Sequence, residues 1–202
     1  MNKLLILLIG LTACTAAMAK EPDGRHQVRI GWGDMMFETF AFRESPKFTV
    51  GDRRHDVSFT GHIFAGYRYA LNKVTSVGVQ ADVEGIFWKE TKYGTDYKPA
   101  GPTYNIRNYN LAILPEVTFT YFRSEWVRLH SGVALGVNIA FDNHSGRVEA
   151  APALNLNAFG VEVGKGNFYG CLDIGALSAM NSNGTIYMLG SRLLSVSLNY
   201  RF

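Results

Sequence analysis

The stretch that decides the fold is S-V-S-L-N-Y-R-F, residues 195–202. Its apolar members, Val196, Leu198, Tyr200 and Phe202, alternate strictly with polar ones. Alternation with a period of two is typical of a β-strand that has one apolar and one polar face. A soluble domain usually ends in a few frayed polar residues, whereas this pattern continues to residue 202. The stretch therefore predicts the closing strand of a small barrel.

The same alternation recurs along the chain, which gives eight predicted strands in all. They cover residues 28–36, 57–71, 76–88, 109–121, 127–141, 153–163, 168–177 and 195–202. Two irregularities are expected within them. Pro115 cannot donate a ladder hydrogen bond, and the alternation changes phase within 153–163, which indicates a β-bulge.

The connections between these strands alternate in length. Short turns are expected at 72–74, 123–125 and 164–167, and long polar connections at 38–56, 89–107, 142–152 and 178–192. An even number of strands with short turns at one end and long loops at the other is typical of bacterial outer-membrane barrels. Strands cross hydrocarbon only as a closed barrel, because every backbone polar group must be paired there. We therefore predict an all-β protein, an eight-stranded antiparallel transmembrane β-barrel.

The aromatic residues support this prediction because they gather towards the two ends of the apolar faces. Such clusters are typical of the interfacial girdles of membrane barrels. Near the long connections lie Phe37, Phe59, Phe87, Tyr109 and Phe141, and near the short turns lie Tyr67, Tyr69, Phe119, Tyr121, Trp126, Phe168, Tyr200 and Phe202.

The first residues are typical of an export signal. Lys3 provides the positive charge, residues 4–13 form a short apolar run, and Ala17-Met18-Ala19 offers a small-x-small cleavage site. We expect residues 1–19 to be a signal peptide and residues 20–202 to be the barrel domain. An alternative stays open, because residues 11–14 (Leu-Thr-Ala-Cys) also match the motif at which lipoproteins are cut before an acylated cysteine.

Composition excludes several functional classes. The net charge of +3 comes from 20 basic and 17 acidic residues that are scattered along the chain, so nucleic-acid binding is not expected. The five histidines show no metal-ligand spacing, and Cys171 is expected to be a packed residue of a strand. No catalytic residue, cofactor or metal is therefore predicted.

The export signal, the eight alternating strands and the ending Tyr200-Arg201-Phe202 together resemble the small outer-membrane β-barrel proteins of the OmpA/OmpX type. The resemblance implies that the protein resides in the outer membrane of a Gram-negative bacterium after export and signal cleavage. There it would contact outer-membrane lipid and lipopolysaccharide. It also implies that the barrel-assembly machinery reads Val196, Leu198, Tyr200 and Phe202 as an assembly signal.

The polar faces predict the contents of the barrel. Eight strands leave an interior just wide enough for side chains to fill, so we expect a network of ion pairs. Its predicted members are Arg29, Arg68, Asp82, Glu84, Glu116, Arg128 and Asp173, together with His62 and His130. We expect a non-enzymatic, porin-like envelope protein whose long extracellular loops form a recognition surface for an unknown ligand. Two alternatives stay open, a lipid A-modifying barrel enzyme and a narrow pore.

Overall fold

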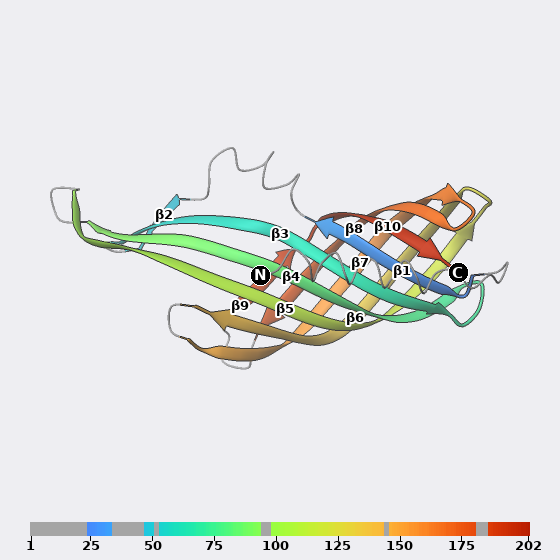
Figure 1. The fold of residues 1–202 in the computed structure, drawn as a ribbon, viewed down its shortest axis with the longest axis horizontal. Coiled ribbons are helices and arrows are strands. Elements are labelled where there is room, and N and C mark those ends of the chain that lie inside the picture. The colour runs from blue at the N-terminus through green and yellow to red at the C-terminus, as the bar shows by residue number, and fades with distance from the viewer. Residues whose placement is uncertain (1–23, 34–46, 51–52, 94–97, 144–145, 181–185) are drawn as a thin grey trace.

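The computed structural model describes residues 24–33, 47–50, 53–93, 98–143, 146–180 and 186–202 (Figure 1). Eight strands make up the barrel: β1 (His26–Gly33), β3 (Arg53–Ala70), β4 (Thr75–Tyr93), β5 (Pro99–Arg123), β6 (Val127–Asp142), β7 (Val148–Lys165), β8 (Phe168–Met180) and β10 (Leu194–Arg201). Two short strands, β2 (Lys47–Val50) and β9 (Ile186–Ser191), pair with β3 and β8. Across these described ranges, no helix is long and apolar enough to cross a membrane.

The barrel closes through β1, which pairs antiparallel with both β10 and β3. Val28 lies opposite Tyr200 on one side and opposite Tyr67 on the other. Beyond the end of β10, Phe202 exchanges two backbone hydrogen bonds with His26, at 3.1 and 2.9 Å, and the two rings stack at 5.4 Å. The predicted eight-stranded antiparallel barrel and the closing role of the last stretch are therefore confirmed.

Successive residues of each strand point alternately outwards and inwards. Ile30, Leu135 and Leu198 face outwards and are 57%, 64% and 54% exposed. Polar side chains such as Arg29, Asn138 and Asn199 are buried inside. The barrel thus presents apolar residues on its outer surface and encloses polar ones, which is the reverse of a soluble domain.

A bulge in β3 corrects one predicted alternation. The β3–β4 register shifts by one residue between Phe59 and His62, where Gly61 adopts a φ of +71° that favours glycine. Thr60 Oγ1 stabilises the bulge by accepting a hydrogen bond from the backbone N–H of Gly85, at 2.8 Å. The pattern predicted for 57–71 therefore does not run unbroken through this strand.

The bulge predicted in residues 153–163 is confirmed. The register shifts on both sides of β7 around Ala158, whose carbonyl accepts a 2.7 Å hydrogen bond from Ser131 Oγ. The irregularity at Pro115 is milder than a bulge. Ile113 pairs with Val137 and Glu116 with Ala134 in one unchanged register, so Pro115 only interrupts the ladder.

The long connections differ most from the prediction. Residues 89–107 were expected to form a loop, but β4 continues to Tyr93 and β5 begins at Pro99, so most of this segment is a hairpin. Likewise, β7 begins at Val148, within the loop predicted for 142–152. Figure 1 shows β3, β4 and β5 extending together well beyond the rest of the barrel. These extensions carry few apolar residues, so their polar composition resembled that of a loop although backbone pairing keeps them in the sheet.

Part of the prediction falls outside the described structure. Phe37, residues 34–36 of the first predicted strand, and the predicted signal peptide all lie outside the described residues, as does the side chain of Phe59.

Candidate functional site

The centre of the barrel holds an ion-pair network that includes four of the predicted interior residues. Arg68 donates two hydrogen bonds to Glu116, from Nε to Oε1 at 2.7 Å and from Nη2 to Oε2 at 3.2 Å. Arg29 lies 3.7 Å from both Glu116 and Asp173, and it donates to Gln80 Oε1. All of these side chains are buried. Two arginines and two carboxylates thus neutralise one another, as burial of charge requires.

A second cluster surrounds His62. Its Nδ1 lies 2.5 Å from Asp82 Oδ1, and its Nε2 lies 3.3 Å from Glu84 Oε1. Arg192 Nη1 donates to the other oxygen of Asp82 at 2.9 Å. This cluster contains the predicted Asp82 and Glu84, and Arg192 balances part of their charge.

The ring of Phe64 links the two clusters. The guanidinium carbon of Arg29 lies 5.1 Å from the ring centroid and that of Arg192 lies 4.2 Å from it, so both form cation–π contacts. Phe64 is fully buried because it lies on the inward face of β3, in the part of the strand that follows the bulge at Gly61.

Sequence reasoning missed Arg192 because it lies within the loop predicted for 178–192. It follows β9 and adopts a left-handed φ of 55°, which costs about 1–3 kcal/mol for a residue with a side chain. The ion pair with Asp82 and the contact with Phe64 offset that cost. A residue outside any alternating pattern gives no sequence signal for such a position.

Glu162 is a second interior residue that sequence reasoning missed, and it connects β7 to β1 and β10, the two strands whose pairing closes the barrel. Its Oε1 accepts hydrogen bonds from Gln27 and Asn199 at 3.0 and 3.1 Å, and its Oε2 accepts one from Arg201. The sequence did contain a signal for Glu162. After the phase change in 153–163, Val161 and Val163 face outwards, so Glu162 between them faces the interior. The predicted Arg128 does not join this network directly. It is half-buried at the short-turn end, with its guanidinium 4.7 Å from the ring of Tyr169.

Among the described residues, His130, Glu162 and Cys171 form a group that could hold a metal ion, since their ligand atoms all lie within 4.8 Å of one another. Imidazole, carboxylate and thiolate are ligands that Zn²⁺ accepts. However, His130 Nε2 is 3.0 Å from Asp173 Oδ1, and both oxygens of Glu162 already accept hydrogen bonds. Coordination by Glu162 would therefore compete with its ion pair to Arg201.

One side of the interior is apolar. A cluster of small and aliphatic side chains packs there between β5, β6, β7 and β8. Its members are Ala112, Leu114, Ala134, Ala153, Leu177 and Ala179.

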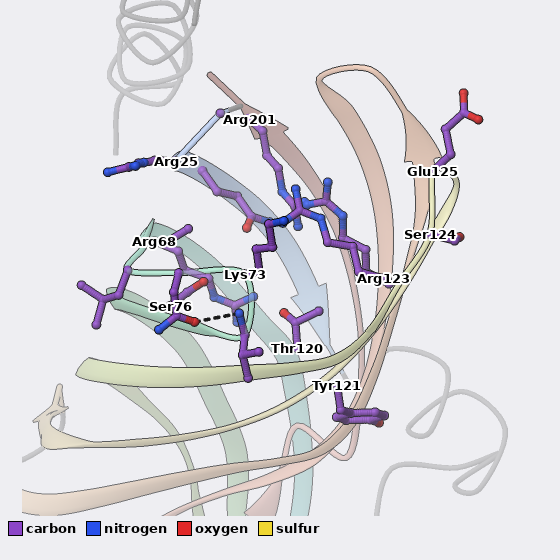
Figure 2. Close-up of a pocket in the computed structure, with 17 residues that line it drawn as sticks. Arg25, Arg68, Lys73, Ser76, Thr120, Tyr121, Arg123, Ser124, Glu125 and Arg201 are labelled. Atoms are coloured by element: carbon purple, nitrogen blue, oxygen red, sulfur yellow. Dashed lines mark hydrogen bonds between the residues drawn. The ribbon is translucent and has the colours of Figure 1, made fainter. Parts of the chain in front are cut away.

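At the short-turn end, the strands surround a cavity of about 810 Å³ (Figure 2). The barrel mouth there is lined by residues of β1, β3, β4, β5, β6 and β10, of the β3–β4 and β5–β6 turns, and by residues 24–25 before β1. Among these, the cationic residues are Arg25, Arg68, Lys73, Arg123, Arg128 and Arg201. Of them, only Arg68 and Arg128 were predicted as site residues.

No protein-family model matches the chain, and no curated protein matches its sequence. Fold and interior together define the class of protein: an all-β, eight-stranded, closed antiparallel barrel whose polar interior is filled by ion pairs.

Proposed function

We propose that the barrel spans the outer membrane of a Gram-negative bacterium and belongs to the small OmpA/OmpX type. The observation that carries this proposal is the apolar outer surface. Exposure of so many large aliphatic side chains to water is unfavourable by about 25 cal/mol per Å², whereas lipid tails solvate them. The exposed aliphatic residues include Ile30, Ile63, Val79, Val83, Ile113, Leu135, Leu154, Leu156, Leu172, Ile174, Val196 and Leu198.

The aromatic residues at the short-turn end support the same proposal. Phe168 and Tyr200 are in ring contact at 4.7 Å on neighbouring strands, and Tyr200 stacks on Phe202 at 6.0 Å. Tyr67, Phe119, Tyr121, Phe122 and Trp126 are exposed around the same end. Rings in such positions suit the boundary between headgroups and hydrocarbon, where their polar groups reach water.

The filled interior supports a non-enzymatic role without solute conduction. The described strands bury their ion pairs and the apolar cluster in the middle of the barrel, and an eight-stranded barrel is only just wide enough for such side chains. We propose that the interior serves as a structural plug. Planar-bilayer conductance above the lipid baseline would favour the narrow pore instead, and a changed acyl pattern in lipid A after deletion or overexpression would favour the enzyme.

The extension of β3, β4 and β5 is the proposed recognition surface. Among the described residues, segment 99–106 of β5 pairs only with β4, because the β5–β6 ladder begins at Asn108. An unpaired strand edge can bind an extended segment of another chain through backbone hydrogen bonds. Exposed Lys89, Lys92, Lys98 and Arg107 give this sheet a basic character that suits an anionic partner.

Two measurements test the proposal. The purified protein is expected to show β-rich circular dichroism and a heat-modifiable gel shift in detergent. An epitope tag inserted in the β4–β5 connection is expected to react with antibody on intact cells. A monomer that stays soluble without detergent would overturn the membrane proposal. A tag that reacts only after permeabilisation would overturn the external position of the sheet extension.

A further inference from the structure

We infer that the mouth of the barrel at the short-turn end is a binding site for the phosphate groups of a small ligand. The site lies at the end of the barrel opposite the sheet extension. It therefore does not depend on the proposed recognition surface, and it requires only the closed barrel.

The charge of the lining is strongly one-sided. Among the described residues that line the cavity, six are cationic and only Glu125 is acidic. The Glu125 side chain is 70% exposed, and its Oε1 lies 3.6 Å from Nζ of Lys165, a residue that is not part of the lining. In Figure 2, the side chains of Lys73, Arg123 and Arg201 extend towards one another, whereas the carboxylate of Glu125 points away from them.

Two of the six cations are already paired with interior acids. Arg68 binds Glu116 and Arg201 binds Glu162. For Lys73, Arg123 and Arg128, the structure shows no ion pair with a carboxylate of the described lining, because the one acid there, Glu125, pairs with Lys165. The low-dielectric wall of the barrel concentrates the field of these charges at the mouth, which attracts anions.

Two hydrogen-bond donors at the mouth lack acceptors. Within the described part of the chain, neither Arg128 Nε nor Arg201 Nη1 has a hydrogen-bond partner, although both atoms are buried from solvent. Both guanidiniums lie 4.7 Å from the ring of the buried Tyr169, so their positions are held by the same side chain. A buried unsatisfied donor is costly, and a bound oxyanion would satisfy it.

The donors favour phosphate over a single carboxylate. Guanidinium presents a planar fork of N–H groups that matches phosphate oxygens, and five of the six cations are arginines. The cavity volume of about 810 Å³ falls in the range of small-molecule sites and greatly exceeds one phosphate ion. The ligand class is therefore a small molecule with more than one phosphate, or the phosphate headgroup of a lipid.

The test measures binding to the full-length folded barrel in a maltoside detergent, which carries no phosphate. Inorganic pyrophosphate is titrated by calorimetry in one arm, and phosphatidylglycerol in mixed micelles is titrated in the other. Arg128→Gln is expected to weaken binding about tenfold, because one charge-assisted contact is lost. Arg123→Gln provides a second variant if Arg128→Gln does not fold, and a heat-modifiable gel shift checks folding. Arg147→Gln, an exposed change outside the cavity lining, is the matched control.

Saturable pyrophosphate binding that falls in Arg128→Gln or Arg123→Gln, and not in Arg147→Gln, supports a site for soluble phosphates. The same pattern with phosphatidylglycerol alone supports the site and assigns the lipid headgroup as its source. The inference is overturned by absence of binding in both arms, or by an equal loss in Arg147→Gln, which would indicate unspecific charge attraction.

Discussion

Neutralising Glu116 is the sharpest test of the ion-paired interior. Glu116→Gln keeps the shape of the side chain but removes the charge that faces two buried arginines. Arg68 then loses its bidentate partner, with contacts of 2.7 and 3.2 Å, and Asp173 at 3.7 Å is the one carboxylate that still pairs with Arg29 among the described residues. The variant leaves the two buried arginines with one carboxylate fewer to neutralise them.

The expected cost follows from the burial of both partners. Arg68 and Glu116 side chains are each only 5% exposed, so their pair is not screened by solvent. Removing one member of such a pair typically costs about 3–5 kcal/mol. With an m-value of about 3 kcal/mol/M in urea, the unfolding midpoint should fall by about 1 to 1.7 M.

The assay is urea unfolding of the barrel in lipid vesicles, followed by tryptophan fluorescence and by the gel shift of the folded form. Glu125→Gln is the matched control, because it makes the same chemical change at a side chain that is 70% exposed. A surface ion pair contributes at most about 1 kcal/mol, so the control should lower the midpoint by no more than about 0.3 M.

The double variant Arg68→Met, Glu116→Gln separates pairing from packing. It removes both charges, so it should be more stable than the sum of the two single effects predicts, by about 0.5–3 kcal/mol. If Glu116→Gln lowers the midpoint no further than Glu125→Gln does, the ion-pair account of the interior is wrong.

Three other expectations concern the end of the β1–β10 pairing, the close packing around Gly160 and the candidate metal ligands. Deleting Phe202 removes two backbone hydrogen bonds and a ring stack on His26, so the folded fraction and the outer-membrane level of the protein should fall. Phe168→Leu is the control. Unchanged outer-membrane levels after the deletion would argue against the assembly role of Phe202. In Gly160→Ala, the new Cβ would come under 3.0 Å from Asp173 Oδ1 and the His130 ring. This should destabilise the barrel by about 1–3 kcal/mol in the urea assay, whereas Gly170→Ala, whose nearest neighbour is at 3.8 Å, should be tolerated; equal effects would contradict the close packing. Zn²⁺ is expected to leave the urea midpoint unchanged, because hydrogen bonds already occupy Glu162; stabilisation that disappears in Cys171→Ser would instead identify a metal centre.

Sequence periodicity predicted the barrel itself well. A strand with one apolar and one polar face has a local signal, because alternate residues point to opposite faces whatever the strand pairs with. That signal identified the eight strands, the closing role of 195–202 and the bulge in β7. It failed for the extensions of β4 and β5, whose few apolar residues leave no apolar face to detect.

The sequence predicted which side chains face the interior, but not which of them contact one another. The alternation assigned Arg29, Arg68, Glu116 and Asp173 to the inside, but it could not give their partners, because partners lie on strands far apart in the chain. Arg29, for example, contacts Glu116 and Asp173 only because barrel closure brings β1 near both β5 and β8.

What the sequence alone determined is therefore the order, the number and the facing of the strands, since these depend on local alternation. Only the tertiary structure decided that Arg192 reaches Asp82 from outside any strand pattern, and that Glu162 joins β7 to β1 and β10. It also decided that cations from separate strands and turns meet at one mouth. Those arrangements depend on register and closure, which set distances between residues that no local pattern connects.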